Sequence, residues 1–383
     1  MITSRSQLQG VAFVGGGSGG HLFPGIAVAQ RACERFPGCH IQFFCAPRRA
    51  DRRVFSHANF PTQIVEIPLP SRADAWIRYS LAVVKATRAL RRSFRARPLD
   101  VVVGLGGYAS VPGILAARAE SIPVILMEQN RVAGRVNRLL SPMVSAVSCS
   151  FAETDFRRTP RCEVTGNPVR REVLAQLERG RYQAQNGRLV ATGNGDGKTV
   201  LVVGGSQGAQ GLNQALLAAM PGLEEWRERV RWIHVAGPGY AAVQKRYDEL
   251  GWRAEVRGFA DDLPELMNAA DFVISRAGGT TLSELAVLGL PALLVPYPYA
   301  RDQHQLVNAR AYAEAGAGIV MREKELRVEP LRAVFRDVLF ESARLEEMVN
   351  CARRLGRPQA ADSVIDLALE LSEPCPSASV SLS

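Results

Sequence analysis

Short runs of apolar residues alternate along the whole chain with segments of helical length. In the first half these runs cover residues 11–14, 41–44, 101–103, 124–127 and 146–149. The second half repeats the rhythm at residues 200–203, 232–235, 272–274 and 292–295. Strands that are apolar on both faces are typical of parallel sheets covered by helices on either side. The pattern therefore predicts an α/β fold with two doubly wound sheets, one in each half.

The length of 383 residues exceeds what one ordinary core supports, so two domains are expected. The Asn-Pro step at Asn167 and Pro168 disfavours a helix through this point and predicts the boundary there. We therefore expect an N-terminal domain over 1–167 and a C-terminal domain over 168–355. The Ser- and Pro-rich residues 373–383 predict a disordered tail.

Three of the predicted strands end in glycine-rich turns, at residues 15–20, 104–107 and 204–208. The first and the last of these turns each lead into a predicted helix. Bare backbone N–H groups at the positive end of a helix dipole favour phosphate. Ligands of open parallel sheets bind beyond the carboxyl ends of the strands. Two such turns, one in each half, predict two phosphate-binding sites that face each other.

The first turn also matches the dinucleotide-binding pattern through Gly15, Gly17 and Gly20. That pattern requires an acidic residue after the second strand to hold a ribose, whereas the strand leads to Arg48 and Arg49. NAD is therefore disfavoured. An NADP-dependent oxidoreductase remains an alternative, because arginines could hold the additional phosphate.

The net charge of +10 indicates a polyanionic partner. The excess is concentrated at residues 71–97, which carry eight cations and one acid. Apolar residues recur there at roughly helical spacing, at Trp76, Ile77, Leu81, Val84 and Leu90. Such a basic amphipathic helix either packs its apolar stripe on the sheet or lies on an anionic membrane surface. Since no spanning apolar run and no signal-peptide core occurs, we expect a cytoplasmic protein.

The seven cysteines show no Cys-x-x-Cys pair and no zinc-ligand spacing. They are Cys33, Cys39, Cys45, Cys149, Cys162, Cys351 and Cys375. An odd, unpatterned set predicts reduced thiols in the core and no metal site.

Candidate chemistry follows the ends of the predicted strands. His21 ends the first glycine turn, where its imidazole could accept a proton from a substrate hydroxyl or simply pack or cap the helix. Glu128 and Asn130 follow the strand at 124–127. The carboxylate of Glu128 could act as a base or bind a sugar hydroxyl, and a cap for the next helix is the alternative, particularly for Asn130. These alternatives stay open on residue chemistry alone.

The densest set of polar residues lies at 275–284, again between a strand and a helix. Gly279, Thr280 and Thr281 suit a diphosphate through backbone donors and two hydroxyls. Glu284, one turn further, could accept both hydroxyls of a ribose. Amide and imidazole groups follow downstream at Gln303, His304 and Gln305.

The motifs as a set resemble the MurG family of glycosyltransferases, in the family's order from about residue 10 to 355. They comprise residues 15–21 with Pro24 and Gly25, residues 106–108, 128–130, 166–170, 204–208 and 275–284. The resemblance implies a GT-B fold, with two Rossmann-like domains and a C-terminal helix, residues 356–372, that returns to the first domain. It also implies inverting transfer of GlcNAc from UDP-GlcNAc to the 4-hydroxyl of MurNAc in lipid I, which gives lipid II for peptidoglycan.

The resemblance implies that UDP-GlcNAc is bound mainly by the C-terminal half. There Phe259 and Ala260 would face uracil and Glu284 the ribose. The diphosphate and the GlcNAc hydroxyls would contact Arg170, Ser206, Gln207, Gly279, Thr280, Thr281, Gln303, His304 and Gln305. From the N-terminal half Ser18, Gly19, Gly20, His21 and Asn130 would also reach the nucleotide sugar.

The resemblance also implies an acceptor site formed by Gly16, Gly17, Gly106, Gly107, Tyr108 and Asn137. The diphosphate and the sugar of the acceptor would also face Ser18, His21, Glu128 and Asn130. His21 and Glu128 are the candidates for the base, and the resemblance favours His21. No cofactor and no dedicated metal site are implied. The resemblance implies a peripheral protein on the anionic inner face of the bacterial plasma membrane, which the stretch 71–97 would contact. A cell-wall synthesis complex is a further implied partner, and no nucleic acid is expected.

Other classes share parts of this pattern. A UDP-GlcNAc epimerase would use the donor site alone, and a nucleotide-sugar or phospholipid-binding module would need no base. Neither these nor an NADP-dependent oxidoreductase explains both the cluster at 275–284 and the basic stretch at 71–97.

Overall fold

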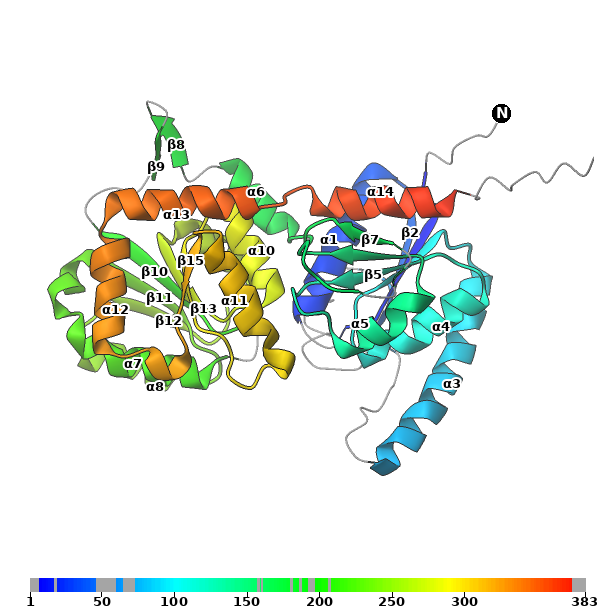
Figure 1. Cartoon of the computed structure of the whole chain (residues 1–383), viewed down its shortest axis with the longest axis horizontal. Helices are drawn as coiled ribbons and strands as arrows, with labels where there is room; N and C mark the ends of the chain where they lie inside the picture. The colour runs from blue at the N-terminus through cyan, green and yellow to red at the C-terminus, as the bar shows by residue number, and fades with distance from the viewer. Residues whose placement is uncertain are drawn as a thin grey trace, which may run out of the picture. The chain divides into compact units, whose positions relative to one another are not determined.

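The computed structural model describes residues 7–16, 19–45, 60–64, 73–156, 159, 161–179, 182–185, 188–191, 197–205 and 208–373. The predicted disordered tail therefore lies almost entirely outside the described residues. The chain divides into two compact units. Unit 1 holds residues 1–129, 133–168 and 359–383, and unit 2 holds residues 130–132 and 169–358. Figure 1 shows a sheet with flanking helices in each unit.

Unit 1 is built on a seven-stranded parallel sheet with the order β3-β2-β1-β4-β5-β6-β7. The strands are β1 (Gly10–Val14), β2 (His40–Cys45), β3 (Thr62–Ile64), β4 (Val101–Gly104), β5 (Val124–Glu128), β6 (Ala146–Cys149) and β7 (Cys162–Val164). All five apolar runs of the first half are strands of this sheet. The edge strands β3 and β7 were not predicted, because each has three residues and almost no buried side chain.

The helices of unit 1 cover both faces of its sheet. They are α1 (Gly19–Arg35), α3 (Ala73–Ala96), α4 (Val111–Ala119), α5 (Arg135–Leu140) and α14 (Ala360–Ser372), with the 3-10 turns η1 (Tyr108–Ser110) and η2 (Ser141–Met143). Alternate residues of β1 point to opposite cores, Val11 and Phe13 toward α1 and α14, Ala12 and Val14 toward α3 and α4. The doubly wound arrangement thus follows from strands that are apolar on both faces.

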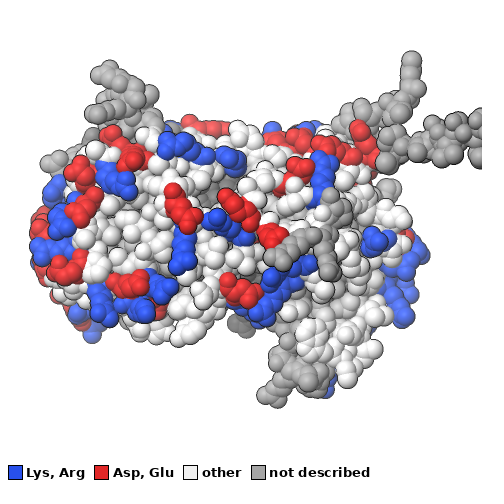
Figure 2. All heavy atoms as spheres, in the orientation of Figure 1, with Lys and Arg blue, Asp and Glu red and all other residues white. Residues whose placement is uncertain are grey.

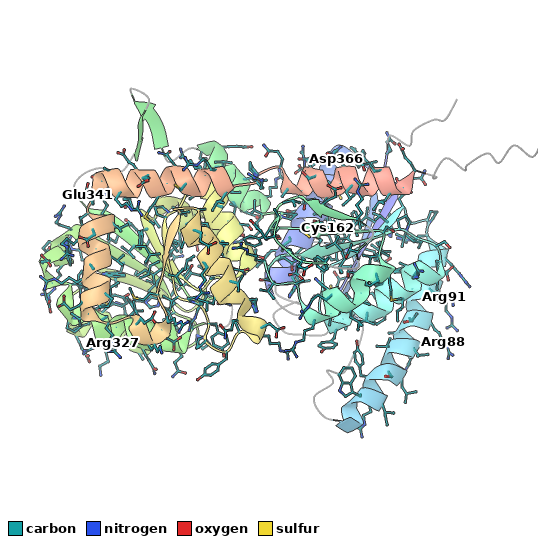
Figure 3. All side chains as sticks on the ribbon, viewed as in Figure 1. Arg88, Arg91, Cys162, Arg327, Glu341 and Asp366 are labelled. Atoms are coloured by element: carbon teal, nitrogen blue, oxygen red, sulfur yellow. The ribbon has the colours of Figure 1, made fainter. Side chains whose placement is uncertain are left out.

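The C-terminal helix α14 packs on α1 in unit 1. Val364 and Ile365 lie in the same core cluster as strand residues of the unit 1 sheet. At the surface Asp362 accepts hydrogen bonds from Arg31 and Arg35, and Arg35 also reaches Asp366, which Figure 3 labels. The chain therefore returns to the first unit after completing the second.

Unit 2 is built on a six-stranded parallel sheet with the order β12-β11-β10-β13-β14-β15. Its strands are β10 (Lys198–Val203), β11 (Val230–Val235), β12 (Ala254–Arg257), β13 (Phe272–Ser275), β14 (Ala292–Leu294) and β15 (Gly318–Val320). A separate antiparallel pair, β8 (Tyr182–Gln185) and β9 (Arg188–Ala191), is not part of the main sheet. The four apolar runs of the second half all lie in the main sheet.

The longer helices of unit 2 connect these strands. They are α6 (Arg171–Arg179), α7 (Gln210–Ala219), α8 (Tyr240–Glu249), α9 (Leu263–Ala269), α10 (Gly279–Leu288), α11 (His304–Glu314), α12 (Val328–Val334) and α13 (Ser342–Leu355). Short helical turns are η3 (Met220–Gly222), η4 (Glu224–Arg229), η5 (Arg301–Gln303), η6 (Glu323–Glu325) and the π-helical η7 (Phe335–Leu339).

Helix α3 packs mainly through residues outside the apolar stripe expected from the sequence. Its buried side chains are Tyr79, Val83, Ala86, Leu90 and Phe94, which pack toward the sheet and α4. Of the predicted stripe only Leu90 is buried. Trp76, Ile77, Leu81 and Val84 are exposed. The helix therefore carries two apolar faces, and the second one is largely exposed.

Candidate substrate sites in the two units

Two glycine turns of unit 1 lie against each other because β1 and β4 are neighbours in the sheet. Gly15 and Gly16 have φ values of 115° and 119°, and Gly106 and Gly107 have 89° and 76°, a region that favours glycine. A Cβ on Gly15 would lie 2.8 Å from the backbone oxygen of Gly106. Only glycine fits this approach, so the two turns form one surface of bare backbone. Gly17 and Ser18 lie outside the described residues.

His21 lies in the first turn of α1, after Gly19 and Gly20, and its ring contacts the second glycine turn. Its Nδ1 lies 2.9 Å from the backbone oxygen of Leu105. A carbonyl oxygen only accepts hydrogen bonds, so Nδ1 donates its proton there. The neutral ring then carries its lone pair on Nε2, as a general base requires.

Glu128 and Asn137 form a buried pair beside this surface, each about 2% exposed. Glu128 Oε2 accepts hydrogen bonds from the backbone N–H of Gly134 and from Asn137 Nδ2, both at 2.8 Å. Asn137 Nδ2 also donates to the backbone oxygen of Met127 at 3.0 Å. The carboxylate of Glu128 is therefore fixed by two donors, which suits a positioning role better than proton abstraction.

These groups belong to one cluster. A Cβ on Gly106 would lie 3.2 Å from Asn137 Oδ1 and 3.4 Å from His21 Nδ1. Unit 1 thus brings together His21, Glu128, Asn137 and Gly106, all of which were predicted as site residues. Tyr108 begins η1 directly after the second glycine turn.

Gln129 was not predicted as a site residue, although it follows Glu128. It is 3% exposed, and both atoms of its amide lack a hydrogen-bond partner among the described residues. Buried amides without a partner are rare in folded proteins and mark places where a ligand or water is bound. Its position in the Glu128-Gln129-Asn130 motif was the signal in the sequence.

Asn130 groups with unit 2 together with the next two residues. Asn308 of α11, which is fully buried, donates from Nδ2 to Asn130 Oδ1 at 3.0 Å and accepts from the backbone N–H of Arg131 at 3.0 Å. The same Nδ2 lies 3.2 Å from the backbone oxygen of Ala277. Asn308 therefore links Asn130 to the segment before α10, a role that the sequence did not reveal.

The glycine turn of unit 2 and the start of α10 emerge at the same edge of the sheet, because Val203 and Ser275 are partners on neighbouring strands. Gly205 and Gly208 have φ values of 92° and 76°. Ser206 and Gln207, between them, lie outside the described residues. The hydroxyl of Ser275 is fully buried and has no partner among the described residues.

Helix α10 begins at Gly279 without a side-chain hydrogen bond from its N-cap residue, Gly278. A glycine N-cap offers no side-chain oxygen to the first backbone N–H groups, and a helix end of this kind favours an anion. Thr280 and Thr281 stand in this first turn, Thr280 buried and Thr281 half-buried. The geometry is that of a phosphate-binding helix N-terminus.

Arg170 and Glu284 were predicted to bind different parts of the nucleotide sugar, and the structure pairs them directly. Arg170 Nε and Nη2 donate to the two carboxylate oxygens of Glu284 at 2.6 and 3.0 Å. Burial by itself lowers the pKa of Arg170, but the charge and hydrogen bonds of Glu284 outweigh it and the pKa is raised. The Arg170 guanidinium therefore keeps its charge where it pairs with Glu284, one turn into α10.

The remaining predicted donor residues lie after β12 and at the junction of η5 and α11. Phe259 is 42% exposed, and the next residue, Ala260, is buried. At the junction Asp302 and Gln303 have φ values of 50° and 51°, which is strained for side chains of this kind. Strain of this type is found at ligand sites.

His304 and Gln305, the first residues of α11, form hydrogen bonds with the backbone of the segment that precedes the helix. His304 Nδ1 donates to the backbone oxygen of Arg301 at 2.8 Å, and Gln305 Oε1 accepts from the backbone N–H of Tyr297 at 2.9 Å. The exposed side chain of Gln303 makes no hydrogen bond within the described part of the chain. Of the three predicted sugar-binding residues, Gln303 is therefore the one whose side chain makes no hydrogen bond there.

Arg276 supports this segment and was not singled out from the sequence. It is 7% exposed, donates to the backbone oxygens of Val295 and Pro296, and forms an ion pair of 2.6 Å with Glu323. Its guanidinium also lies 5.5 Å from the ring centroid of Tyr297. Arg276 thus fixes the path of the chain as it leaves β14.

Comparison with known proteins identifies the family. The description "Glycosyltransferase family 28 N-terminal domain" matches residues 11–149, and the corresponding C-terminal domain matches residues 199–364. The UDP-N-acetylglucosamine--N-acetylmuramyl-(pentapeptide) pyrophosphoryl-undecaprenol N-acetylglucosamine transferase of Anaeromyxobacter dehalogenans (strain 2CP-C) is 39% identical over 363 residues, 93% of this chain and 91% of the relative. The crystal structure of Acinetobacter baumannii MurG is 31% identical, covers 94% of this chain and 99% of its own, and has a TM-score of 0.73. The chain belongs to the MurG family of glycosyltransferases.

Membership in the MurG family confirms the predicted GT-B architecture with two parallel-sheet α/β domains. An enzyme of the same name from Myxococcus xanthus (strain DK1622) is 36% identical over 369 residues, 94% of this chain and 92% of the relative. A putative UDP-N-acetylglucosamine 2-epimerase from Listeria monocytogenes shares the fold at a TM-score of 0.64 but only 14% identity. The likeness to the epimerase shows the fold alone, and the family match favours a glycosyltransferase.

Proposed function

We propose that the chain transfers GlcNAc from UDP-GlcNAc, with inversion, to the 4-hydroxyl of MurNAc in lipid I at an anionic membrane surface. The product would be lipid II for peptidoglycan synthesis. The observation that carries this proposal is the tautomer of His21, whose Nδ1 is bound to Leu105 and whose Nε2 is left as a base beside two glycine turns. Curated relatives that cover almost the whole chain carry the name of this transferase.

The acceptor would bind in unit 1. In this proposal the backbone of Gly16, Gly17, Gly106 and Gly107 takes its diphosphate, and Tyr108, Asn137 and Ser18 line the same surface. His21 Nε2 takes the proton of the 4-hydroxyl as that oxygen forms a bond to the anomeric carbon of GlcNAc. Glu128, held by Asn137 and the Gly134 N–H, orients the sugar and the cluster.

The donor would bind mainly in unit 2. The bond from the anomeric carbon to UDP breaks as the new bond forms, and the leaving diphosphate gains charge. The N-terminus of α10 with Thr280 and Thr281, the turn carrying Ser206 and Gln207, and Arg170 would stabilise that charge. Glu284 would accept the ribose hydroxyls, Phe259 and the Ala260 backbone would face uracil, and Gln303 with the neighbouring His304 and Gln305 would bind the GlcNAc hydroxyls. Further contacts to UDP-GlcNAc would come from Gly19, Gly20, His21 and Asn130.

We also propose that no resident metal takes part, since Arg170 and a helix N-terminus supply positive charge at the diphosphate. Within the described residues no group of three or more His, Cys, Asp or Glu side chains is arranged to hold a metal ion. Treatment with a chelator should leave the transfer rate unchanged, and a loss restored by a divalent cation would refute this part.

The membrane contact would be made by α3. Trp76, Ile77, Leu81 and Val84 are 48 to 69% exposed, and Lys85 and Arg88 are exposed on the following turn. Figure 2 displays a largely uncharged surface over the N-terminal part of α3 and basic side chains toward its C-terminal part. Helix surfaces of this composition bind anionic bilayers. None of the helices in the described part of the chain is long and apolar enough to cross a membrane.

Contacts within unit 1 join this helix to the acceptor surface. Tyr79 donates its hydroxyl to the backbone oxygen of Tyr108 at 3.3 Å, and the rings of Trp76 and Tyr79 meet that of Tyr108 edge to face. A membrane-embedded polyprenyl tail and its diphosphate would then be held by adjoining parts of one unit.

The decisive experiment incubates the purified chain with labelled UDP-GlcNAc, with and without a lipid I analogue in vesicles. UDP release that depends on the acceptor, together with a labelled disaccharide lipid, supports the transferase. Isomerisation of the donor without acceptor would instead identify an epimerase. Donor binding without any turnover in the presence of the acceptor would indicate a binding module.

A further inference from the structure

Two cysteine side chains meet at the edge of the unit 1 sheet. Cys149 is the last residue of β6 and is fully buried, and Cys162, labelled in Figure 3, is the first residue of the edge strand β7 and is exposed. Their Sγ atoms lie 2.7 Å apart, and both cysteines are free thiols. The exposure of Cys162 corrects the expectation that the cysteines are core thiols.

The register of the two strands explains this contact. Cys162 is the Cα partner of Val147, and Cys149 is the partner of Val164, so the two cysteines are diagonal neighbours on the same face of β6 and β7. In a disulfide the sulfur atoms are about 2.05 Å apart. The two sulfur atoms are therefore already close to the separation of a bond.

The pair adjoins the unit 1 cluster that contains Glu128. Glu128 and Cys149 are Cα partners on β5 and β6 and point to the same face. Burial raises the pKa of Cys149, and the contact with Cys162 and the charge of Glu128 raise it further. The buried thiol is therefore a poor first nucleophile, whereas Cys162 is open to solvent.

We propose that Cys149 and Cys162 are a thiol modification site that forms a reversible disulfide by exchange with a low-molecular-weight disulfide such as oxidised glutathione. Cys162, after losing its proton to water, attacks one sulfur of the glutathione disulfide, and one glutathione thiol leaves. Cys149 then loses its proton and attacks Sγ of Cys162, which displaces the second glutathione as a thiol. Two protein thiols are oxidised, one small disulfide is reduced to two thiols, and the exchange runs backward with excess glutathione.

The bond would act on the surface beside Glu128. It would fix the edge strand β7 to β6 and rotate the Cys149 side chain next to the carboxylate that holds Asn137 and the Gly134 N–H. This consequence rests on the proposed function, and it predicts a change in use of the acceptor with no change in binding of UDP-GlcNAc. The formation of the bond itself does not depend on that function.

Peptide mapping of the full-length protein tests the site. The reduced protein is equilibrated with mixtures of reduced and oxidised glutathione, remaining thiols are alkylated, and peptides are analysed by mass spectrometry without reduction. A cross-link between the peptides of Cys149 and Cys162 is expected, with alkylation of Cys33 and Cys39 retained as an internal control. Two freely alkylated thiols at every ratio, or a cross-link to a different cysteine, would overturn the proposal.

Two variants separate the steps. Cys149→Ser removes the second nucleophile, so a stable mixed disulfide with glutathione should accumulate on Cys162. Cys162→Ser should leave Cys149 unmodified, because the buried thiol has lost its entry point. Glutathione found on Cys149 in that variant would contradict the assigned order of attack.

Kinetics test the coupling to the acceptor surface. The oxidised wild type should show a severalfold lower kcat/KM for the lipid acceptor and an unchanged Kd for UDP-GlcNAc, both restored by dithiothreitol, while Cys162→Ser should be insensitive to oxidation. A cross-linked enzyme with unchanged acceptor kinetics would overturn the coupling. If no transferase activity is found at all, the proposed function fails, and the peptide map still decides the modification site.

Discussion

Arg170 and Glu284 lie 114 positions apart in the sequence and form a bidentate ion pair in unit 2. Their side chains are 14% and 4% exposed, so neither charge is well solvated. Removal of one member of a buried pair leaves the other charge uncompensated, which costs about 3–5 kcal/mol. The pair therefore couples the stability of unit 2 to the residues proposed to hold the ribose and the diphosphate.

Glu284→Ala should lower the free energy of unfolding by about 3 kcal/mol and weaken UDP-GlcNAc binding severalfold or more. Denaturant unfolding and calorimetric titration measure the two effects. The Arg170→Ala variant and the double variant complete a thermodynamic cycle, in which a large coupling energy is expected. Unchanged affinity in Glu284→Ala would refute its ribose role, even if stability falls.

His21→Asn should remove the proposed base and keep the hydrogen bond to Leu105. The amide of Asn can still donate toward the backbone oxygen of Leu105, but it offers no group in place of Nε2. Loss of a general base reduces kcat by about 10²–10⁴, and we expect this loss to exceed any rise in the KM for UDP-GlcNAc. Steady-state kinetics with the lipid acceptor measure both.

Glu128→Gln is the matched comparison for the second candidate base. The Gln side chain keeps an oxygen for the Gly134 N–H and Asn137 Nδ2, so the cluster should persist. A positioning role for Glu128 predicts a much smaller loss of kcat than in His21→Asn. An equal or larger loss would transfer the role of base to Glu128.

The sequence predicted the central strands well for a physical reason. Each is buried on both faces, so its apolar run is uninterrupted, as in β1 and β10. The edge strands β3 and β7 carry no such signal because their side chains are largely exposed. The sequence left open whether the stripe on α3 packs on the sheet or faces outward, since apolar residues at helical spacing occur on two sides of that helix.

The sequence allowed the types of residue in the candidate sites to be predicted, but not the contacts between them. His21, Glu128, Glu284 and Arg170 stand beside turns and strand ends that are visible in the sequence. That Arg170 binds Glu284, or that Leu105 fixes the His21 tautomer, depends on strand order and helix packing, which place distant segments together. No local pattern encodes these contacts.

His234, on β11, gives a prediction about pH. It is fully buried, and burial lowers its pKa from 6.5 to about 3. Asn213 Nδ2 donates to the backbone oxygen of Ala236, so Asn213 Oδ1 accepts from His234 Nε2 at 3.0 Å, and Nδ1 accepts from the hydroxyl of Tyr247 at 3.2 Å. The network holds the neutral ring and has no place for a second proton.

The unfolded chain takes up this proton below about pH 6.5, whereas the folded chain does so only near pH 3. Stability from the neutral ring is therefore complete above pH 6.5 and is lost as the pH falls from there toward 3. At pH 4.5 the loss should reach about 2–3 kcal/mol. Denaturant unfolding between pH 4.5 and 7.5 measures it.

His234→Phe should flatten this part of the pH profile, although it lowers stability at pH 7 by removing two hydrogen bonds. His40→Gln, at a more exposed histidine, is the control and should leave the profile unchanged. A wild-type profile that is equally steep in His234→Phe would show that other groups cause the acid sensitivity.

The exposed face of α3 yields the prediction about membranes. Burying a Leu or Ile side chain in a bilayer interface contributes about 1.5–3 kcal/mol, so Ile77→Ser and Leu81→Ser should each weaken binding to anionic vesicles about tenfold or more. Arg88→Glu should weaken vesicle binding further and reduce the salt dependence of that binding, because each nearby cation contributes about 1 kcal/mol.

The side chains of Ile77 and Leu81 are more than 60% exposed, so the unfolding temperature of these variants should not change. Leu355→Ser, an exposed leucine in unit 2, is the control, and equal loss of vesicle binding in that variant would remove the assignment to α3.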